Sequence, residues 1–302
     1  MIKRILLLLI LTVVIMPSKL VLAATYYADT NGDGYTETIT TNSNNISIYH
    51  PKTNTTSYYY YNTGTFAINS IVDTDGVAGA EIIVIFANSV NKGIDVISDA
   101  ANRTHTYSYN SASSFSINTT TDTDGIAGNE IIVNYTSVSN GINVICDRTQ
   151  VTHSYVISPG TYSINSVADT DGTAGNEIII VYNNTVNQGI KVICDRTQIV
   201  HDYPKNSGFS INSVTDTDGA SGADIIVVTS SVGPEIDIIH DRNQTTSQYS
   251  VGGTGTTFTI MSVRDYDGYP GAEVCYNWVY NTLSGYRRIT DRTKTSTDVP
   301  GC

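Results

Sequence analysis

Acidic residues recur along this chain in one short loop pattern. The pattern reads Asp-x-Asp-Gly-x-x-Gly-x-Glu, and copies start at Asp73, Asp122, Asp169, Asp216 and Asp265, in steps of 49, 47, 47 and 49 residues. Side-chain oxygens at alternating loop positions can converge on one point, and calcium accepts about six to eight oxygen ligands in adaptable geometry. The spacing therefore predicts a calcium site in each loop.

The first loop, Asp29 to Glu37, is the most complete copy, with oxygen side chains at loop positions 1, 3, 5 and 9. The other five loops lack a carboxylate at position 5, so main-chain carbonyls or water would have to complete the coordination sphere. We predict up to six Ca²⁺ ions, one per loop. The predicted ligands are Asp29, Asn31, Asp33, Glu37, Asp73, Asp75, Glu81, Asp122, Asp124, Glu130, Asp169, Asp171, Glu177, Asp216, Asp218, Asp224, Asp265, Asp267 and Glu273.

The charge balance favours cations at these loops. They hold 18 of the 28 acidic residues, and three like charges within nine residues repel unless they are neutralised. Magnesium suits such loops less well because it requires a stricter octahedron. The alternative interpretation is that the loops are Asp-Gly turns whose carboxylates cap backbone amides.

The segments between the loops repeat as strands. Each of the last five loops is preceded by an alternating stretch, such as 209–214, and the first four of these five are followed by an Ile/Val run, such as 178–182. Alternation indicates a strand, and a continuous β-branched run suits a strand that is buried on both faces. Two further strands per unit follow. Four short antiparallel strands in about 47 residues are typical of a propeller blade.

The sequence thus predicts one all-β domain, 24–302, built as a β-propeller of about six four-stranded blades. How the ring would close between the last and first blades is left open, because the first blade is short at its start. The expected blades are 24–62, 63–110, 111–158, 159–205, 206–252 and 253–302.

The loop Asp29–Glu37 resembles the calcium loop of FG-GAP/VCBS repeats, the blades of integrin-α-type propellers. The resemblance extends over the chain through the repeat, but it is close only in the first loop. It implies a propeller that holds calcium between the first two strands of a blade, as is common in adhesion and ligand-binding proteins.

A second loop, Asp-Arg-Thr or Asp-Arg-Asn, joins the third and fourth strands, as at Asp147 and Asp241. We interpret its arginine as paired with nearby carboxylates; a ring of arginines for an anionic ligand is the alternative. Six residues after three of these aspartates stand His105, His153 and His201, for which repetition predicts one structural niche rather than zinc ligation or catalysis. Eight residues after the turn aspartate, the second to fifth units have a tyrosine (Tyr107, Tyr155, Tyr203 and Tyr249), which is predicted to pack between blades. In the first unit, the alignment places His50 and Tyr58 at the aspartate and tyrosine positions.

The N-terminus has the form of an export signal. Lys3 and Arg4 precede an apolar run of about a dozen residues, and 21–24 offers a small-residue cleavage site. Without 1–23, the chain keeps 13 basic and 28 acidic residues, a formal charge of −15, which disfavours nucleic acid and anionic membranes. We expect a secreted protein with no membrane insertion after cleavage; periplasm, cell surface and medium stay open, as does the oligomeric state.

The four cysteines fall into two pairs. Cys146 and Cys194 occupy the same place in successive units, where equivalent atoms should lie beyond the bridging limit of roughly 7 Å, so we expect small buried side chains. Cys275 and Cys302 are open to two readings, a disulfide that ties down the C-terminal tail or two free thiols.

Three functions remain open. We favour an extracellular binding or adhesion module for a glycan or protein. We do not expect an enzyme, and we assign no catalytic residues. The alternatives are a polysaccharide-active enzyme, for which Arg264, Arg287 and Arg288 are the only hint, and a calcium-dependent surface or matrix subunit. Aromatic residues that break the repeat gather in the last blade, and the predicted ligand contacts are Tyr269, Trp278, Tyr280 and Tyr286.

Overall fold

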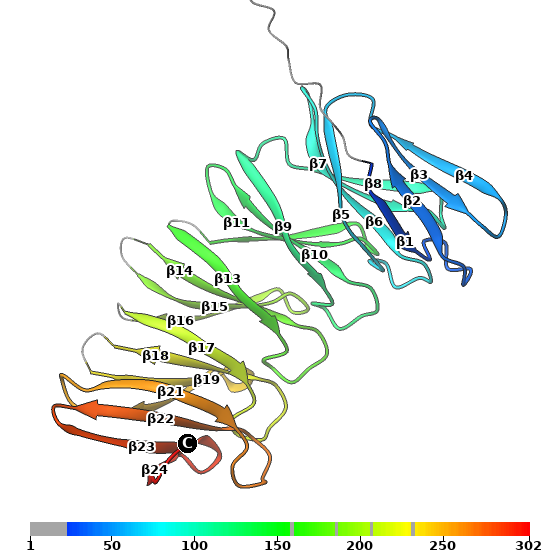
Figure 1. Ribbon diagram of the computed structural model, residues 1–302. Coiled ribbons are helices and arrows are strands. Elements are labelled where there is room, and N and C mark those ends of the chain that lie inside the picture. The colour runs from blue at the N-terminus through cyan, green and yellow to red at the C-terminus, as the bar shows by residue number, and fades with distance from the viewer. Residues whose placement is uncertain (1–22, 158–159, 185–186, 206–207, 231–232) are drawn as a thin grey trace, which may run out of the picture.

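The structure, a computed structural model, describes residues 23–157, 160–184, 187–205, 208–230 and 233–302. It is built of six four-stranded antiparallel sheets, each a meander of consecutive strands (Figure 1). The prediction of an all-β fold made of propeller-type blades is confirmed. The expected export signal lies outside the described residues, among which no helix is long and apolar enough to cross a membrane.

Each blade contributes four strands in chain order, here called its first to fourth strand. The strands are β1 (Thr25–Ala28), β2 (Glu37–Thr41), β3 (Asn45–His50), β4 (Thr55–Tyr60); β5 (Thr65–Val72), β6 (Glu81–Ala87), β7 (Lys92–Ser98), β8 (Arg103–Ser108); β9 (Ser114–Thr121), β10 (Glu130–Thr136), β11 (Asn140–Cys146), β12 (Val151–Val156); β13 (Thr161–Ala168), β14 (Glu177–Asn183), β15 (Gln188–Cys194), β16 (Ile199–Lys205); β17 (Phe209–Thr215), β18 (Asp224–Thr229), β19 (Glu235–His240), β20 (Thr245–Ser250); β21 (Thr257–Arg264), β22 (Glu273–Tyr280), β23 (Leu283–Thr290) and β24 (Thr295–Val299). Two short 3-10 turns, η1 (Asp241–Asn243) and η2 (Asp291–Thr293), precede β20 and β24.

The second strand of an inner blade is buried on both faces. Consecutive side chains point to opposite sides of a strand, so Ile131 joins the hydrophobic cluster shared with the preceding blade and Ile132 the cluster shared with the following one. In the described part of the chain, five such clusters join the six blades pairwise. The Ile/Val runs are therefore two-sided interblade cores, as predicted.

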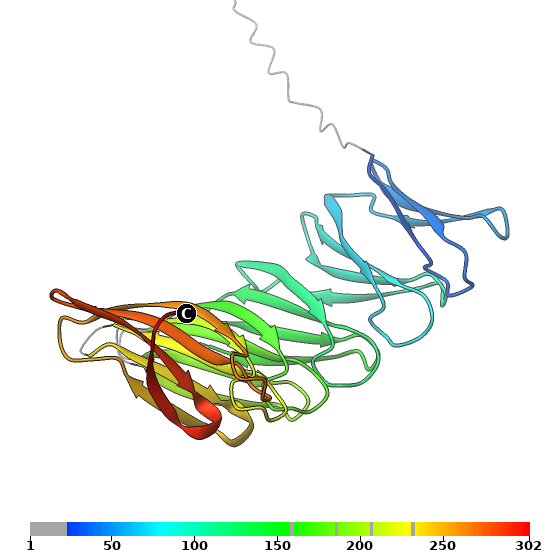
Figure 2. The same cartoon turned by 60° about the horizontal axis from the view of Figure 1, so that its bottom comes forward.

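The blades form an open array. The first and last blades lie at opposite ends in both views (Figures 1 and 2). Among the described residues, no hydrophobic cluster joins β1–β4 to β21–β24. The first blade buries Ile39, Ile46 and Ile48 toward the second blade. Its other face carries Thr38 and Thr40 together with the exposed rings of Tyr27, Tyr49, Tyr58 and Tyr60. This face is therefore not the purely polar surface that usually caps a repeat array.

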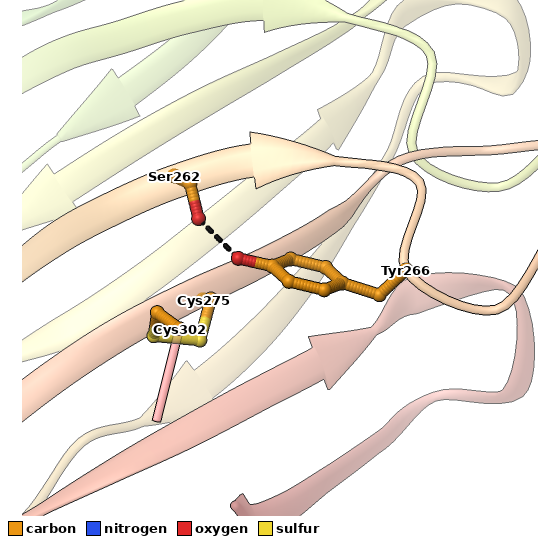
Figure 3. The surroundings of a disulfide bond; sticks show 4 residues. All are labelled: Ser262, Tyr266, Cys275 and Cys302. Atoms are coloured by element: carbon orange, nitrogen blue, oxygen red, sulfur yellow. Dashed lines mark hydrogen bonds between the residues drawn. A yellow bond between two sulfur atoms is a disulfide. The ribbon is translucent and has the colours of Figure 1, made fainter.

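The last blade is tied to the C-terminal tail by a disulfide between Cys275 on β22 and Cys302 (Figure 3). Beside it, the Tyr266 ring lies under the guanidinium groups of Arg264 and Arg288, at 4.5 and 4.2 Å. The disulfide is thus the outcome of the two that the sequence left open. Cys146 and Cys194 are free and buried, as predicted.

Candidate functional site: the acidic loop edge

All the acidic loops lie on one edge of the array, since a meander returns its first and third connections to the same end. Within the second blade's loop, Asp73 Oδ1 accepts the Gly76 N–H at 2.7 Å and Asp75 Oδ1 accepts the Val77 N–H at 2.9 Å. The buried Glu81 accepts both the backbone N–H and the hydroxyl of Thr74, at 2.8 and 3.2 Å. The carboxylates therefore cap turns as well as gather negative charge.

Successive loops are stacked directly on one another. The Asn129 N–H donates to Asp73 O in the preceding loop at 2.9 Å, and the same bond recurs along the array. A Cβ placed on Gly125, whose φ is +75°, would come within 2.4 Å of Ala174 O in the following loop. The glycine of the motif is therefore required by the contact between blades and not only by the turn within its own loop.

We expect Gly125→Ala to destabilise the fold more than Gly34→Ala. Gly34 also has a positive φ, +84°, but nothing lies within 4 Å of an added Cβ. Both variants carry the left-handed backbone cost of about 1–2 kcal/mol, and only Gly125→Ala adds overpacking of about 1–3 kcal/mol. Chemical denaturation of the two variants measures the difference, and equal losses would contradict the stacked-loop explanation.

Each loop also receives one cation from the turn after the third strand. Arg148 Nη2 lies 2.7 Å from Asp124 Oδ2, and its Nη1 donates to Ala127 O at 2.8 Å. The second blade has Ala100 at the arginine position, and there Arg103 pairs with Asp75 instead, at 3.1 Å. The equivalent pairs are Lys52–Asp33, Arg196–Asp171, Arg242–Asp218 and Arg292–Asp267. The interpretation of these arginines as carboxylate partners is confirmed.

The aspartate of the same turn connects neighbouring blades. Asp241 of the fifth blade is 1% exposed and accepts hydrogen bonds from three residues of the fourth blade. These are the Tyr203 hydroxyl at 2.5 Å and the Thr170 hydroxyl at 3.1 Å, and His201 Nδ1 lies 2.8 Å away. Equivalent contacts form at Asp99, Asp147, Asp195 and Asp291. The repeated histidines and tyrosines therefore share one interblade niche, as predicted.

The alignment of the first blade was wrong by one residue. Tyr59, not Tyr58, donates to Asp99 at 3.1 Å, and Asn54 has the positive φ of the equivalent Asn102. Pro51 therefore stands at the aspartate position. The turn 51–54 is as long as the turn 99–102, and the first blade differs earlier, since the segment from Glu37 to Pro51 is shorter than that from Glu81 to Asp99. At the other end of the array, Val299 occupies the tyrosine position, so neither end blade has the group that would continue the same contact.

The predicted calcium ligands converge most completely in the first two loops. One oxygen from each of Asp29, Asp33 and Glu37 lies within 4.8 Å of the others, and Asp73, Asp75 and Glu81 form the same arrangement. The Asn31 amide donates to Glu37 Oε1 at 3.2 Å. Three carboxylates of this kind match the hard oxygen ligands that calcium prefers.

The third and fourth loops differ because a cysteine replaces the first aspartate in the converging group. These groups are Asp124, Glu130 and Cys146, and Asp171, Glu177 and Cys194. Burial first, and then the neighbouring aspartates, raise the pKa of Glu130, and raise that of Glu177 to about 7. The loop carboxylates are thus gathered closely enough that a proton or another cation is favoured among them.

The fifth loop contains its own cation. His240 Nδ1 lies 2.7 Å from Asp224 Oδ1, and its Nε2 lies 3.0 Å from Asp291 Oδ2 in the next blade. Burial alone would lower the pKa of His240, but these two carboxylates raise it to about 9. Asp216 Oδ1 caps Gly219 at 2.7 Å. Together with Arg242 on Asp218 and Lys294 on Asp291, an imidazolium at His240 balances the three carboxylates of this cluster at neutral pH. In the sixth loop, Asp265 and Glu273 act as backbone caps.

The four predicted ligand-contact aromatics do not form one surface. Tyr269 lies on the loop edge with Arg292 4.9 Å from its ring, whereas Trp278 and Tyr280 line a cavity of about 300 Å³ at the opposite edge. Tyr286 is paired with Asn277, on the other face of the sheet from Trp278. Only Trp278 and Tyr280 come together.

No protein-family model and no curated protein sequence matches this chain. Among solved structures, it is similar to TolB from Acinetobacter baumannii, with 11% identity and a TM-score of 0.32 over 92% of this chain and 63% of TolB. It is also similar to the extracellular domain of a putative one-component system from B. thetaiotaomicron, with 15% identity and a TM-score of 0.33 over 91% of this chain and 36% of that one. It is similar as well to the WD40 domain of SCAP from fission yeast, with 9% identity and a TM-score of 0.34 over 88% of this chain and 67% of that one. The chain spans less than two thirds of the first two proteins. These likenesses concern the all-β fold alone.

The sequence analysis missed residues that matter because they break the repeat instead of following it. Lys205, Thr229, Glu235 and Asp237 meet in a cavity of about 670 Å³ between the fourth and fifth blades. At other interfaces, the position of Lys205 holds a tyrosine or an aliphatic residue. In other blades with a long second strand, the position of Thr229 holds an aromatic residue and that of Glu235 a glycine, so alignment of the units against one another would have revealed these three. Asp237 follows the repeat, since the second blade has Asp95 at its position.

Proposed function

We propose that this chain is a secreted, calcium-stabilised binding module that presents a glycan- or protein-binding surface on an array of propeller blades. The observation that carries the proposal is the carboxylate cage of the first loop. Glu37 is fully buried there, within 4.8 Å of oxygens from Asp29 and Asp33. The chain supplies one ammonium, Lys52, 3.5 Å from Asp33 and half exposed, and His50 Nδ1 lies 3.8 Å from Glu37 Oε1.

The charge of this cage supports a divalent cation. Three carboxylates and one ammonium leave a formal charge of −2, which one Ca²⁺ balances. The second loop has the same balance, since Arg103 faces Asp73, Asp75 and Glu81. We therefore place the best calcium sites in the first two blades, with the loops of the other four blades as additional candidates.

The stacking of loops explains why calcium would matter to binding. Each loop bonds to the next through backbone N–H groups, so an ion that fixes one loop also restrains its neighbour. The apolar interblade cores lie next to these loops. The export pattern, the acidic surface and the resemblance of the first loop to adhesion-type propellers all agree with an extracellular role.

Calcium should raise the unfolding temperature of the 24–302 chain after metal removal. An ion that binds only the folded state adds about 2.7 kcal/mol per site at a hundredfold excess over its dissociation constant. Asp33→Asn should reduce both the increase and the number of bound ions, whereas Asp202→Asn, far from the loops, should change neither. Calorimetry with equilibrium dialysis measures both quantities.

The binding role is tested by presenting the same protein to arrays of extracellular glycans and proteins, with calcium and after chelation. We expect calcium-dependent capture. No capture in calcium would contradict the binding role, and no bound calcium would make the acidic loops plain turns.

A further inference from the structure

The cavity between the fourth and fifth blades occupies a niche that the repeat fills elsewhere. It lies on the edge opposite the acidic loops and has a volume of about 670 Å³, in the usual range for ligand pockets. Its wall includes Gln188 and Lys205 from the fourth blade, and Thr229, Glu235, Asp237 and Gln248 from the fifth.

At other interfaces, an aromatic or aliphatic side chain occupies the position of Lys205. Tyr61 stacks on Phe66 at 4.5 Å in the first interface, and Tyr109 stacks on Phe115 at 4.5 Å in the second. In the third, Ile157 belongs to the hydrophobic cluster. With lysine in place of this aromatic or aliphatic side chain, the apolar packing is lost only between the fourth and fifth blades.

Two further departures from the repeat enlarge and polarise the same niche. In the other blades with a long second strand, an aromatic residue faces a glycine across the sheet, as Tyr182 faces Gly189 and Trp278 faces Gly285. In the fifth blade, Thr229 faces Glu235. The small threonine vacates the space of an aromatic ring, and a carboxyl group enters where a glycine would stand.

A buried acceptor at the wall of this cavity lacks a partner. Asp237 is 3% exposed; its Oδ2 lies 2.5 Å from Lys205 Nζ, while its Oδ1 has no hydrogen-bond partner within the described residues. Buried carboxylate oxygens are rarely left unpaired. Burial first, and then the Asp237 carboxylate, raise the pKa of the neighbouring Glu235 carboxyl. The unpartnered Asp237 oxygen points to a ligand that donates a hydrogen bond here.

We infer that this cavity binds a neutral saccharide. The inference rests on the proposed binding role and names its ligand class and its site. Amides both donate and accept hydrogen bonds, carboxylates accept them and an ammonium donates them, so the wall matches a ring of hydroxyl groups. Lys205 already supplies a cation to Asp237, which disfavours a cationic ligand. The acidic surface, at −15, disfavours an anionic one.

The equivalent niche one blade further on supplies an aromatic surface. It is lined by Trp278, Tyr280, Leu283 and Arg287, and has a volume of about 300 Å³. The hairpins β18–β19 and β22–β23 lie side by side at this edge (Figure 1). An oligosaccharide can therefore continue from the polar cavity toward the rings of Trp278 and Tyr280, which makes an oligosaccharide a better probe than a single sugar.

The repeat itself provides variants that close the cavity without a foreign contact. Lys205→Tyr places a tyrosine next to Asp237, and this pair already exists between the first two blades, where Tyr61 hydrogen-bonds Asp95. The double variant Thr229→Tyr with Glu235→Gly restores the pair that Tyr182 and Gly189 form in the fourth blade. Thr65→Tyr, on the exposed start of β5, is the matched control.

The experiment is calorimetric titration of the 24–302 chain in calcium with maltohexaose, cellohexaose, xylohexaose, mannohexaose and chitohexaose, and with hexagalacturonate as the anionic probe. We expect at least one neutral hexasaccharide to bind. Both cavity-closing variants should weaken it at least tenfold while the unfolding temperature stays unchanged, and Thr65→Tyr should not weaken it.

Three results would overturn the inference: no binding of any neutral probe, preference for hexagalacturonate, or full binding by both cavity-closing variants. Each of them is distinguishable from failure of the proposed function. Calcium-dependent capture of a protein, or of a glycan that the closed variants still bind, would preserve the binding role and remove only this site.

Discussion

Replacement of Asp241 by alanine is expected to lower the free energy of unfolding by about 3–6 kcal/mol, because it removes two hydrogen bonds to a charged group, each worth about 1.5–3 kcal/mol. Asp241 is 1% exposed and lies at the centre of the contact between the fourth and fifth blades. Without it, the Tyr203 and Thr170 hydroxyls lose their carboxylate acceptor in a site that water does not reach. Urea denaturation followed by circular dichroism measures the loss.

Two controls show whether the loss comes from the interblade contact. Tyr203→Phe removes a single hydrogen bond to a charged group, so we expect a smaller loss of about 1.5–3 kcal/mol. Asp202→Asn changes an aspartate next to Tyr203 on β16, whose side chain is 45% exposed and paired with Lys191. For this variant we expect a loss of about 0–1 kcal/mol. Equal effects of Asp241→Ala and Asp202→Asn would show that the aspartate turn does not hold the blades together.

The array also predicts how the Asp241→Ala variant unfolds. Each blade contacts only its neighbours, so stability is nearly a sum of blade and interface contributions. Weakening the fourth interface should separate blades one to four from blades five and six. We expect a second unfolding transition or a broadened one, in place of a uniform shift of a single transition.

The repeat made the strands and their burial predictable. The run Ile178 to Tyr182 could be recognised as a two-sided strand because four units show the same pattern, and a single unit would have left helix and strand unresolved. The acidic loops were visible for the same reason. In each, however, the sequence could not distinguish a carboxylate that holds an ion from one that caps a turn. Asp73 does cap a turn, and its oxygen also lies in a group able to hold an ion.

Departures from the repeat were harder to interpret. Pro51 was missed because it lacks the carboxylate that marks this position in the other units, and the hydrogen bond of Tyr59 and the positive φ of Asn54 reveal the shift. Lys205 was overlooked because a residue that matches no pattern carries no signal in a search for patterns. Its meaning depends on Thr229 and Glu235, which lie in another blade, and sequence order does not bring them together.

The open ends of the array follow from the same comparison. In the inner blades, a buried aspartate receives the tyrosine of the preceding unit, whereas Pro51 offers no carboxylate and Val299 no hydroxyl. The outer side of the first blade carries threonines and exposed tyrosines. The last blade instead fastens its tail across β22 through Cys302, so the two ends are finished by different means.

Loss of the disulfide should therefore destabilise the last blade specifically. Cys275 and Cys302 are 27 residues apart, and closing a loop of this length in the unfolded chain corresponds to about 3–4 kcal/mol. Cys302→Ser should lower the stability of β21–β24 by this amount. It should leave the first four blades unaffected, because none of them contacts the tail. Hydrogen exchange resolved by blade measures the effect. As a control, Cys194→Ser, at a free buried thiol of the fourth blade, should act there and not in the last blade. If hydrogen-exchange protection of β21–β24 were unchanged by Cys302→Ser, the contacts of Tyr266 with Arg264 and Arg288 would suffice to stabilise this end of the array.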